Sequence, residues 1–540
     1  MLERTYRRRV PPQQAVTPEL ARHLTTASHD LGREVGVLIG RDGIVRNVIV
    51  GNARGLMLPD IGRLRGGTGR FRGLRLLHTR LRGSALNRDD LNDLVLLRLD
   101  LVAVIEVLDG GWPGRLEAAY LDPASLAGSG NGDVPAEPFL RIRSRSVHDL
   151  ELDFQATIQA LEREFARLAR RTRGPKGAER VMVVGLRPED AHFAETLELV
   201  RSAGVTIAGR MRQRRPRIHP RTVLGKGKLE ELVLESMRSN ATAAVFDIDL
   251  KPAQARAFED LTGLKAVDRT QLILDIFAQR ARSADGKLQV ELAQLKYSLP
   301  RLTEKDEGLS RLTGGIGGRG PGETVMEIGR RRIRTRIRRL EKRVEHLSRQ
   351  RELRRRRRRR QGLPVLSIIG YTNAGKSTLL NALTNSVVAA HDQLFMTLDP
   401  TSRRLRFPRE GEVLITDTVG FIAELPPDLI SAFRATLEEL ADANLLLHVI
   451  DAADPELDDK IRAVEMLLVD LDLNRIPSVK VLNKMDLLSP EQVSALCGRI
   501  GGLAVSATRR EGLAELVKTA EDRLSRPEAP RWNTSYTTPI

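Results

Sequence analysis

The segment from Gly370 to Ser377 has the residue types and spacing of a loop that binds nucleotide phosphates. It reads GYTNAGKS, follows the apolar run VLSIIG and precedes the helix-forming run TLLNAL. Glycines at its ends let backbone N–H groups point at phosphate oxygens, the lysine reaches the β- and γ-phosphates, and the serine hydroxyl reaches Mg²⁺. The N-terminus of the following helix adds partial positive charge. The pattern predicts a magnesium-dependent nucleoside triphosphate site.

Three further segments, each directly after an apolar run, complete a guanine nucleotide site. Asp417 follows EVLIT and suits the magnesium shell, and Gly420 can offer its backbone N–H to the γ-phosphate. In NKMD, residues 483–486 after SVKVL, the Asp486 carboxylate can accept hydrogen bonds from N1–H and the exocyclic amine of guanine. Adenine lacks this donor pair, so the motif favours GTP over ATP. Ser506-Ala507 follows LAV and would close over the base.

These segments give a specific set of predicted site residues. We expect Lys376 and Gly420 to act in hydrolysis, and Ser377 and Asp417 to bind magnesium. After the glycine, many GTPases have a glutamine that orients the attacking water, whereas this chain has Phe421, so unaided hydrolysis should be slow. The residues predicted to bind the nucleotide are Gly370, Tyr371, Thr372, Asn373, Ala374, Gly375, Lys376, Ser377, Thr378, Asp417, Asn483, Lys484, Asp486, Ser506 and Ala507.

Asn373 leaves two interpretations open. Some GTPases with asparagine at this loop position bind a potassium ion beside the β- and γ-phosphates, and G-x-x-N-x-G-K-S in this chain is similar to theirs. The asparagine carbonyl would supply one ligand, which makes potassium a candidate cofactor besides GTP and Mg²⁺. Alternatively, Asn373 only tolerates a tight turn, as asparagine does well.

Positive charge is concentrated in one segment. Lys+Arg 88 minus Asp+Glu 70 gives +18 for the chain, while residues 330–360 alone hold seventeen Arg, one Lys and three Glu, which is +15. Clustered cations release counterions when they bind a polyphosphate, so this segment favours RNA or DNA as a partner. A solvated helix and an anionic membrane surface are the alternatives. Arginine rather than lysine favours bidentate phosphate contacts.

The elements that must position these motifs indicate an α/β fold. VLSIIG, EVLITD, NLLLHVID and SVKVLN are typical of buried parallel strands in a P-loop domain over 363–525. Before it, Leu288–Leu302 and Ile333–Leu347 repeat apolar residues at steps of four and three, which predicts an antiparallel helical hairpin over 268–362. Pro300 should kink or end its first helix. Residues 310–324 would form its glycine-rich tip, and the arginine run its base.

The remaining chain divides by composition. We expect a flexible tail over 1–30, an α+β module over 31–122, a linker over 123–146, an amphipathic helix with a small α/β subdomain over 147–267, and a tail over 526–540. A single cysteine excludes a disulfide within the chain. The start lacks the apolar run of a signal peptide, and no window is apolar enough to span a membrane, so we expect a cytoplasmic protein.

The residue sequences of the motifs resemble those of the HflX family of translation-associated GTPases. The similar segments are GYTNAGKST, HDQLFMTLDPTSRRL, DTVGFIAELP and, upstream, GKGKLEEL, DRTQLILDIFAQRA, LQVELAQLKYSLPRL and SRLTGGIGGRGPGET, within about residues 180–525. The resemblance implies GTP hydrolysis that is weak alone and stimulated by ribosomes. It also implies that Thr397 is a catalytic switch threonine that closes on Mg²⁺ and the γ-phosphate. By its residue type alone, Thr397 could be an ordinary loop residue.

The same resemblance implies a partner and a role. The GTP-bound protein would dock on the large ribosomal subunit, with the arginines on rRNA phosphates and the hairpin tip towards the peptidyl-transferase region. The family splits or rescues stalled ribosomes, and we expect a monomer without integral membrane association. A ribosome assembly or hibernation factor, an RNA-binding protein that uses GTP only as a conformational lock, and a metabolic or signalling GTPase with a protein partner remain as alternatives. The tip glycines suit close approach to RNA or simply a flexible turn.

A second resemblance concerns the module at 31–122. Glu34, His78-Thr79-Arg80 and Asp90 are similar to the glutamate, H-x-H and aspartate of JAMM-type metalloproteases. Arg80 stands where the second histidine belongs, and an arginine cannot ligate zinc. The resemblance therefore implies a degenerate copy without a working metal site, and an unrelated structural module is the alternative.

Overall fold

The computed structural model describes two compact units, residues 1–200 with 204–269 and residues 201–203 with 270–540. The described residues are 2–52, 55–56, 58, 71–83, 85–123, 138–171, 179–213, 218–302, 325–360, 363–384, 395, 401–407, 409, 411–417, 420–421 and 440–525; at 168–171, 325–326, 354–360 and 401 only the backbone is described. Within these ranges, no helix has the length and apolar character needed to cross a membrane. The predicted α/β class is confirmed.

A six-stranded mixed sheet forms the first part of the N-terminal unit. Its order is β2-β1-β3-β4-β5-β6, in which only β3 and β4 run parallel. Strands β1 and β2 form a hairpin around Arg41-Asp42-Gly43, and Gly43 takes the positive φ of 76° that its turn requires. The strands are β1 (Val35–Gly40), β2 (Val45–Val50), β3 (Leu74–Arg80), β4 (Leu101–Val107), β5 (Pro113–Leu121) and β6 (Phe139–Ser144).

Two boundaries predicted around this sheet are wrong. Residues 1–30 do not form a loose tail, because α1 (Pro18–Leu31) buries Leu20 and Leu24 in the core and packs on β1, β3 and β4. The helix is 14 residues long, and local signals mark both of its ends. The Thr17 side chain caps its N-terminus, and Gly32 takes a left-handed conformation directly after its C-terminus. Part of the expected linker at 123–146 is strand β6, which pairs with β5, while residues 124–137 lie outside the described ranges.

The second part of the N-terminal unit is the predicted α/β subdomain. Its four parallel strands have the order β10-β9-β7-β8 and share one continuous hydrophobic core with the first sheet. The two regions, expected as separate domains, are therefore one compact unit, joined by contacts of α2 (Arg88–Leu96) and α4 (Phe154–Arg171) with α6 (Lys226–Ser239). The remaining elements are β7 (Arg180–Gly185), β8 (Thr206–Arg212), β9 (Ala243–Phe246), β10 (Lys265–Val267), α5 (Asp190–Ser202) and α7 (Pro252–Thr262).

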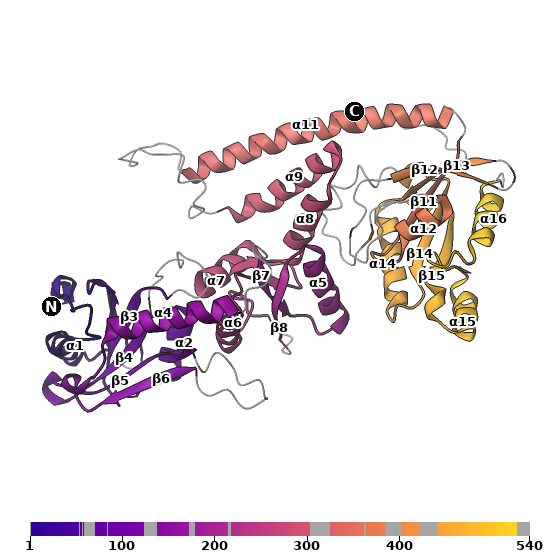
Figure 1. Cartoon of the computed structure of the whole chain (residues 1–540). Coiled ribbons are helices and arrows are strands. Elements are labelled where there is room, and N and C mark those ends of the chain that lie inside the picture. The colour runs from indigo at the N-terminus through magenta and orange to yellow at the C-terminus, as the bar shows by residue number, and fades with distance from the viewer. Residues whose placement is uncertain are drawn as a thin grey trace. The chain divides into compact units, whose positions relative to one another are not determined.

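A pair of helices precedes the nucleotide-binding motifs. After α8 (Arg269–Arg280), α9 (Ala284–Ser298) packs along α11 (Val325–Arg360) through apolar residues that include Leu292, Ile337 and Leu340 (Figure 1). The helices run antiparallel, as predicted, because Arg351 late in α11 lies 3.9 Å from Asp285 at the start of α9, whereas Arg330 early in α11 donates to the carbonyl of Leu302 just after α9. Pro300 lies in a short 3₁₀ turn that ends the first helix, as expected. The tip at 310–324 lies outside the described residues.

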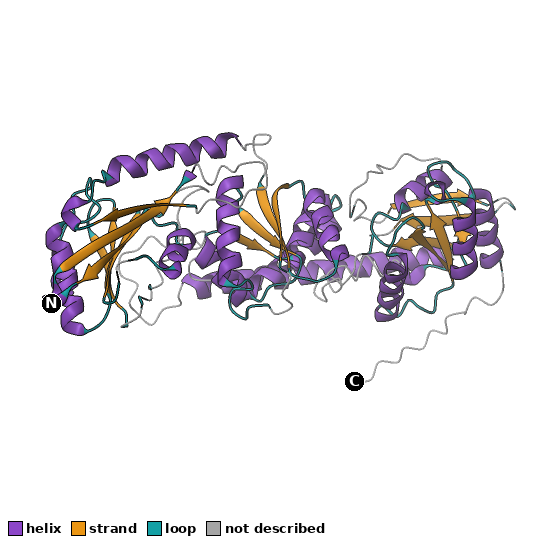
Figure 2. Ribbon diagram, turned by 90° about the horizontal axis from the view of Figure 1, so that it is seen from below, coloured by secondary structure: helices purple, strands orange, loops and turns teal. Residues whose placement is uncertain are grey.

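The C-terminal domain is a six-stranded sheet flanked by helices (Figures 1 and 2). The strand order is β12-β13-β11-β14-β15-β16, and β12 alone is antiparallel to its neighbour. The predicted motifs follow the carboxyl ends of β11, β13, β15 and β16, where open α/β sheets bind ligands. The elements are β11 (Val365–Gly370), β12 (Thr401–Arg406), β13 (Glu412–Asp417), β14 (Leu445–Asp451), β15 (Ser478–Asn483), β16 (Leu503–Ala504), α12 (Lys376–Thr384), α14 (Leu457–Asp470), α15 (Pro490–Ile500) and α16 (Leu513–Leu524).

Candidate functional site

The loop between β11 and α12 is held by contacts that only glycine permits at both ends. A Cβ on Gly370 would lie 2.2 Å from the carbonyl oxygen of Val449, and one on Gly375 would lie 2.2 Å from Nδ2 of Asn483. Gly375 also has a φ of 89°, in the region that side chains avoid. The loop therefore passes close over β14 and β15 and delivers Lys376 and Ser377 to the start of α12.

Lys376 is a buried cation at the floor of the loop. Its Nζ donates to the carbonyl oxygen of Tyr371 at 2.7 Å, and burial lowers its pKa to about 8 although Asp417 opposes the shift. A phosphate beside the ammonium would favour the charged form, because an opposite charge offsets desolvation. The arrangement is thus suited to an anion.

Ser377 and Asp417 come together from α12 and the end of β13. The Ser377 hydroxyl donates to the Asp417 carboxylate at 2.7 Å. Hydroxyl and carboxylate oxygens are ligands that Mg²⁺ accepts, so this pair fits the predicted metal. The third predicted ligand, Thr397, lies outside the described residues, as do Thr418 and Val419.

Gly420 and Phe421 lie directly against the loop. The backbone N–H of Thr372 donates to the carbonyl of Phe421 at 2.7 Å, and the N–H of Phe421 donates to the carbonyl of Gly370 at 3.1 Å. The Phe421 side chain is buried, and its apolar ring cannot orient water. A Cβ on Gly420 would lie 2.8 Å from Cγ2 of Thr372 and 2.9 Å from Nζ of Lys376, so glycine is required at this position.

The NKMD and Ser506-Ala507 segments form one hydrogen-bonded unit. Asn483 donates to the loop carbonyl of Ala374 at 2.9 Å and accepts from the N–H of Ala507 at 3.1 Å. The Ser506 hydroxyl donates to Oδ1 of Asp486 at 2.6 Å, which lowers the pKa of Asp486 and keeps the carboxylate ionised at neutral pH. The structure therefore brings these residues to one end of the sheet, as the motif order predicts.

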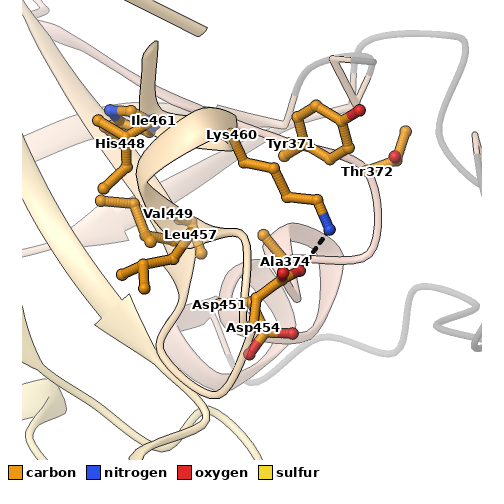
Figure 3. Close-up of a pocket in the computed structure, with 11 residues that line it drawn as sticks. Tyr371, Thr372, Ala374, His448, Val449, Asp451, Asp454, Leu457, Lys460 and Ile461 are labelled. Carbon is orange, nitrogen blue, oxygen red and sulfur yellow. Dashed lines mark hydrogen bonds and ion pairs between the residues drawn. The ribbon is translucent and has the colours of Figure 1, made fainter. Parts of the chain in front are cut away.

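Some contacts at this site were not expected from the sequence. Lys484 pairs with Asp451 at 2.7 Å at the end of β14. On the other side of the loop, Lys460 of α14 pairs with Asp454, and its Nζ lies 5.2 Å from the Tyr371 ring centre. Tyr371, Asp451, Asp454 and Lys460 line a pocket between the loop and α14 (Figure 3). Long-range pairs of this kind carry no local sequence signal.

Asn373 has the conformation of a tight turn. Its φ is 63°, in the left-handed region that asparagine tolerates, and its side chain is exposed. This geometry agrees with the interpretation that Asn373 tolerates a tight turn. It does not test the interpretation that Asn373 binds potassium.

A separate polar cluster lies in the N-terminal unit. Glu34, His78, Arg80 and Asp90 come together in its first sheet, where Arg80 lies 3.6 Å from Glu34 and 2.9 Å from Asp90, and His78 lies 3.3 Å from Asp90. Burial raises the pKa of Glu34 despite the nearby positive charge of Arg80. Asp90 also completes a capping box with Asn87 at the start of α2, which is a structural role. Within the described ranges, no group of three or more His, Cys, Asp and Glu could hold a metal ion.

Comparisons with known proteins find similarity to GTPases. Family models match at residues 190–278 ("GTP-binding GTPase N-terminal"), 280–358 ("GTP-binding GTPase Middle Region") and 365–484 ("50S ribosome-binding GTPase"). A GTPase HflX of Caldanaerobacter subterraneus subsp. tengcongensis is 49% identical, over 64% of this chain and 81% of the relative. The GTPase HflX of Escherichia coli is 46% identical, over 61% and 78%. A solved GTP-binding protein of Sulfolobus solfataricus in complex with GDP is 22% identical over 64% of this chain and 99% of that chain, with a TM-score of 0.38.

Proposed function

The chain belongs to the HflX family of GTPases, and on that premise we propose that its GTP-bound form binds the large ribosomal subunit and splits or rescues stalled ribosomes. The observation that carries the proposal is the presence, in one compact unit, of the guanine nucleotide site and the arginine-rich helix α11. The model that matches residues 365–484 describes GTPases that bind the 50S ribosome, which supports the same partner.

In this proposal each part of the site has one task. Backbone N–H groups of the loop, other than the Thr372 N–H that Phe421 holds, surround the α- and β-phosphates, and Lys376 turns from the Tyr371 carbonyl to the β- and γ-phosphates. Gly420 offers its N–H to the γ-phosphate, and Asp486 with Ser506-Ala507 binds the guanine. Ser377, Asp417 and Thr397 hold magnesium, which supplies charge neutralisation at the β- and γ-phosphates when bound.

The arginines of α11 would provide the electrostatic contact with the ribosome. Residues 330–360 carry a net +15, and α11 continues through all of them. Arginine matches phosphate geometry with a rigid fork of donors and stays charged at any physiological pH. Such contacts position a protein on RNA without reading its sequence, which suits docking on the phosphate backbone of rRNA.

Sedimentation of purified ribosomes separates this role from its alternatives. The protein with a non-hydrolysable GTP analogue should pellet with large subunits and shift 70S particles towards free subunits, whereas the GDP form should do neither. Co-sedimentation without splitting would favour hibernation or assembly. No nucleotide-dependent binding would refute the ribosome as partner, and binding without any turnover of GTP would favour a conformational lock.

Potassium is proposed as an additional cofactor at Asn373. With Phe421 in place of glutamine, a cation beside the β- and γ-phosphates would stabilise the charge that hydrolysis redistributes. Hydrolysis at matched ionic strength should be several-fold faster in potassium chloride than in sodium or caesium chloride, and Asn373→Ala should abolish the difference. Equal rates in the three salts would leave only the turn role of Asn373.

The cluster of Glu34, His78, Arg80 and Asp90 supports a degenerate JAMM-like module. In this interpretation the Arg80 guanidinium takes the place of a metal ion and neutralises both carboxylates. Because a guanidinium cannot activate water as zinc does, the module would have a binding or structural task and no peptidase activity.

A further inference from the structure

The Thr372 hydroxyl is a buried polar group that has no hydrogen-bond partner among the residues that the structure describes. Thr372 is 6% exposed, and its Oγ1 makes no hydrogen bond among the described residues, although its own N–H is bonded to Phe421. A buried hydroxyl without a partner costs free energy, and nearly all such groups in proteins are hydrogen-bonded. The orphaned oxygen in a phosphate-binding loop therefore indicates a ligand atom as its partner.

The position of the side chain indicates which part of the ligand this is. The Thr372 methyl and the Lys376 ammonium both approach the same point beside Gly420, at 2.8 and 2.9 Å from where a Cβ would stand. Lys376 and Gly420 are the groups that the proposed site assigns to the γ-phosphate. The base end is remote in the fold, since Asp486 and Ser506 lie after β15 and β16. In Figure 3, Thr372 lies beside Tyr371 on the loop.

We infer that the Thr372 hydroxyl donates a hydrogen bond to a non-bridging oxygen of the γ-phosphoryl group of bound GTP, and that it is a catalytic residue. This rests on the proposed nucleotide site. During hydrolysis, the water oxygen forms a bond to the γ-phosphorus, and the bond from phosphorus to the β–γ bridging oxygen breaks. Its electron pair stays on GDP, one water proton remains on phosphate and the other goes to solvent. Thr372 exchanges no proton and only stabilises charge on the transferred group.

Such a donor answers a need that Phe421 creates. The Phe421 side chain offers no hydrogen bond to the γ-phosphate. Thr372, in contrast, has a hydroxyl to donate, and its backbone N–H is hydrogen-bonded to the Phe421 carbonyl. The same bond fixes the loop backbone from which the hydroxyl projects. A pre-positioned donor of this kind loses little entropy when the phosphoryl group arrives.

Valine tests the proposal because it keeps the shape of threonine and removes the hydroxyl. Thr372→Val should bind GDP as wild type does, because GDP lacks the γ-phosphate. Its affinity for a non-hydrolysable GTP analogue and its single-turnover hydrolysis rate should each fall about ten- to a hundredfold, the effect of one hydrogen bond to a charged group. Thr372→Ser should restore both. Thr384→Val is the matched control, since the Thr384 hydroxyl donates to the Leu380 carbonyl of its own helix and Thr384 is outside the predicted nucleotide-site residues.

The outcomes separate this inference from the site on which it rests. Unchanged analogue affinity and rate in Thr372→Val would overturn it. An equal loss of affinity for GDP and for the analogue would also overturn it, because the hydroxyl would then stabilise the loop and would not bind the γ-phosphate. If the wild-type chain bound no guanine nucleotide, the proposed site itself would fail. Thermal unfolding of each variant with and without GDP distinguishes misfolding from any of these.

Discussion

Replacing Asp486 by asparagine is expected to exchange guanine for xanthine as the preferred base. In the wild type, Ser506 donates to Oδ1 of Asp486 at 2.6 Å, so we expect Oδ2 to be the oxygen that accepts from the base. The same hydroxyl would hold the amide oxygen of the introduced asparagine, so that the amide nitrogen takes the place of Oδ2. That nitrogen is a donor and opposes the N1–H and amine donors of guanine, whereas xanthine presents a carbonyl in place of the amine.

The size of the change follows from the lost contact. A hydrogen bond to a charged group contributes about 1.5–3 kcal/mol, so the loss of one should weaken GDP about ten- to a hundredfold. Xanthosine diphosphate should gain in relative affinity, and ATP should stay weak. Competition against a fluorescent nucleotide, with each base in turn, measures these ratios.

The matched control is Glu491→Gln. Glu491 also accepts from a serine hydroxyl, that of Ser489 at 2.8 Å, but lies at the start of α15 and is not among the predicted site residues. Glu491→Gln should leave the affinities for GDP, xanthosine diphosphate and ATP unchanged. Adding Ser506→Ala to Asp486→Asn should reduce the preference for xanthine. Without the Ser506 hydroxyl, the introduced amide can rotate by about 180° and present its oxygen to guanine. Equal losses for GDP and ATP analogues in Asp486→Asn would refute the guanine assignment.

Other predictions test the remaining parts of the chain. Neutralising Arg354–Arg360 with glutamine should weaken ribosome binding and reduce its log–log salt slope by about 0.7–0.9 per lost phosphate contact, with GDP affinity unchanged; an unaltered slope would mean that the run is solvated. Deleting Gly314–Gly322 should preserve intrinsic GTP hydrolysis and impair action on ribosomes, and normal splitting by the deletion variant would contradict a role for the tip. Elemental analysis of the purified protein should find no stoichiometric zinc, and one zinc per chain that His78→Ala removes would overturn the degenerate-site proposal.

The nucleotide site could be predicted in large part from the sequence because its chemistry is local. A phosphate-binding loop needs glycines, a lysine and a serine within one turn between a strand and a helix, so short-range spacing specifies it. Apolar runs likewise predicted β11, β13, β14 and β15, and the heptad steps predicted α9 and α11. Pro300 marked the end of α9, since proline removes a helix donor.

Contacts between distant segments were decided by tertiary structure alone. No local pattern indicates that Ser506 orients Asp486, that Asp451 pairs with Lys484, or that the residues ahead of Leu31 pack into a core. The four residues of the N-terminal cluster were predicted together through a resemblance, yet only the fold places the Arg80 guanidinium between Glu34 and Asp90. The physical reason is that burial and ion pairing depend on which surfaces meet, and residues far apart in sequence meet only when the sheets and helices have packed.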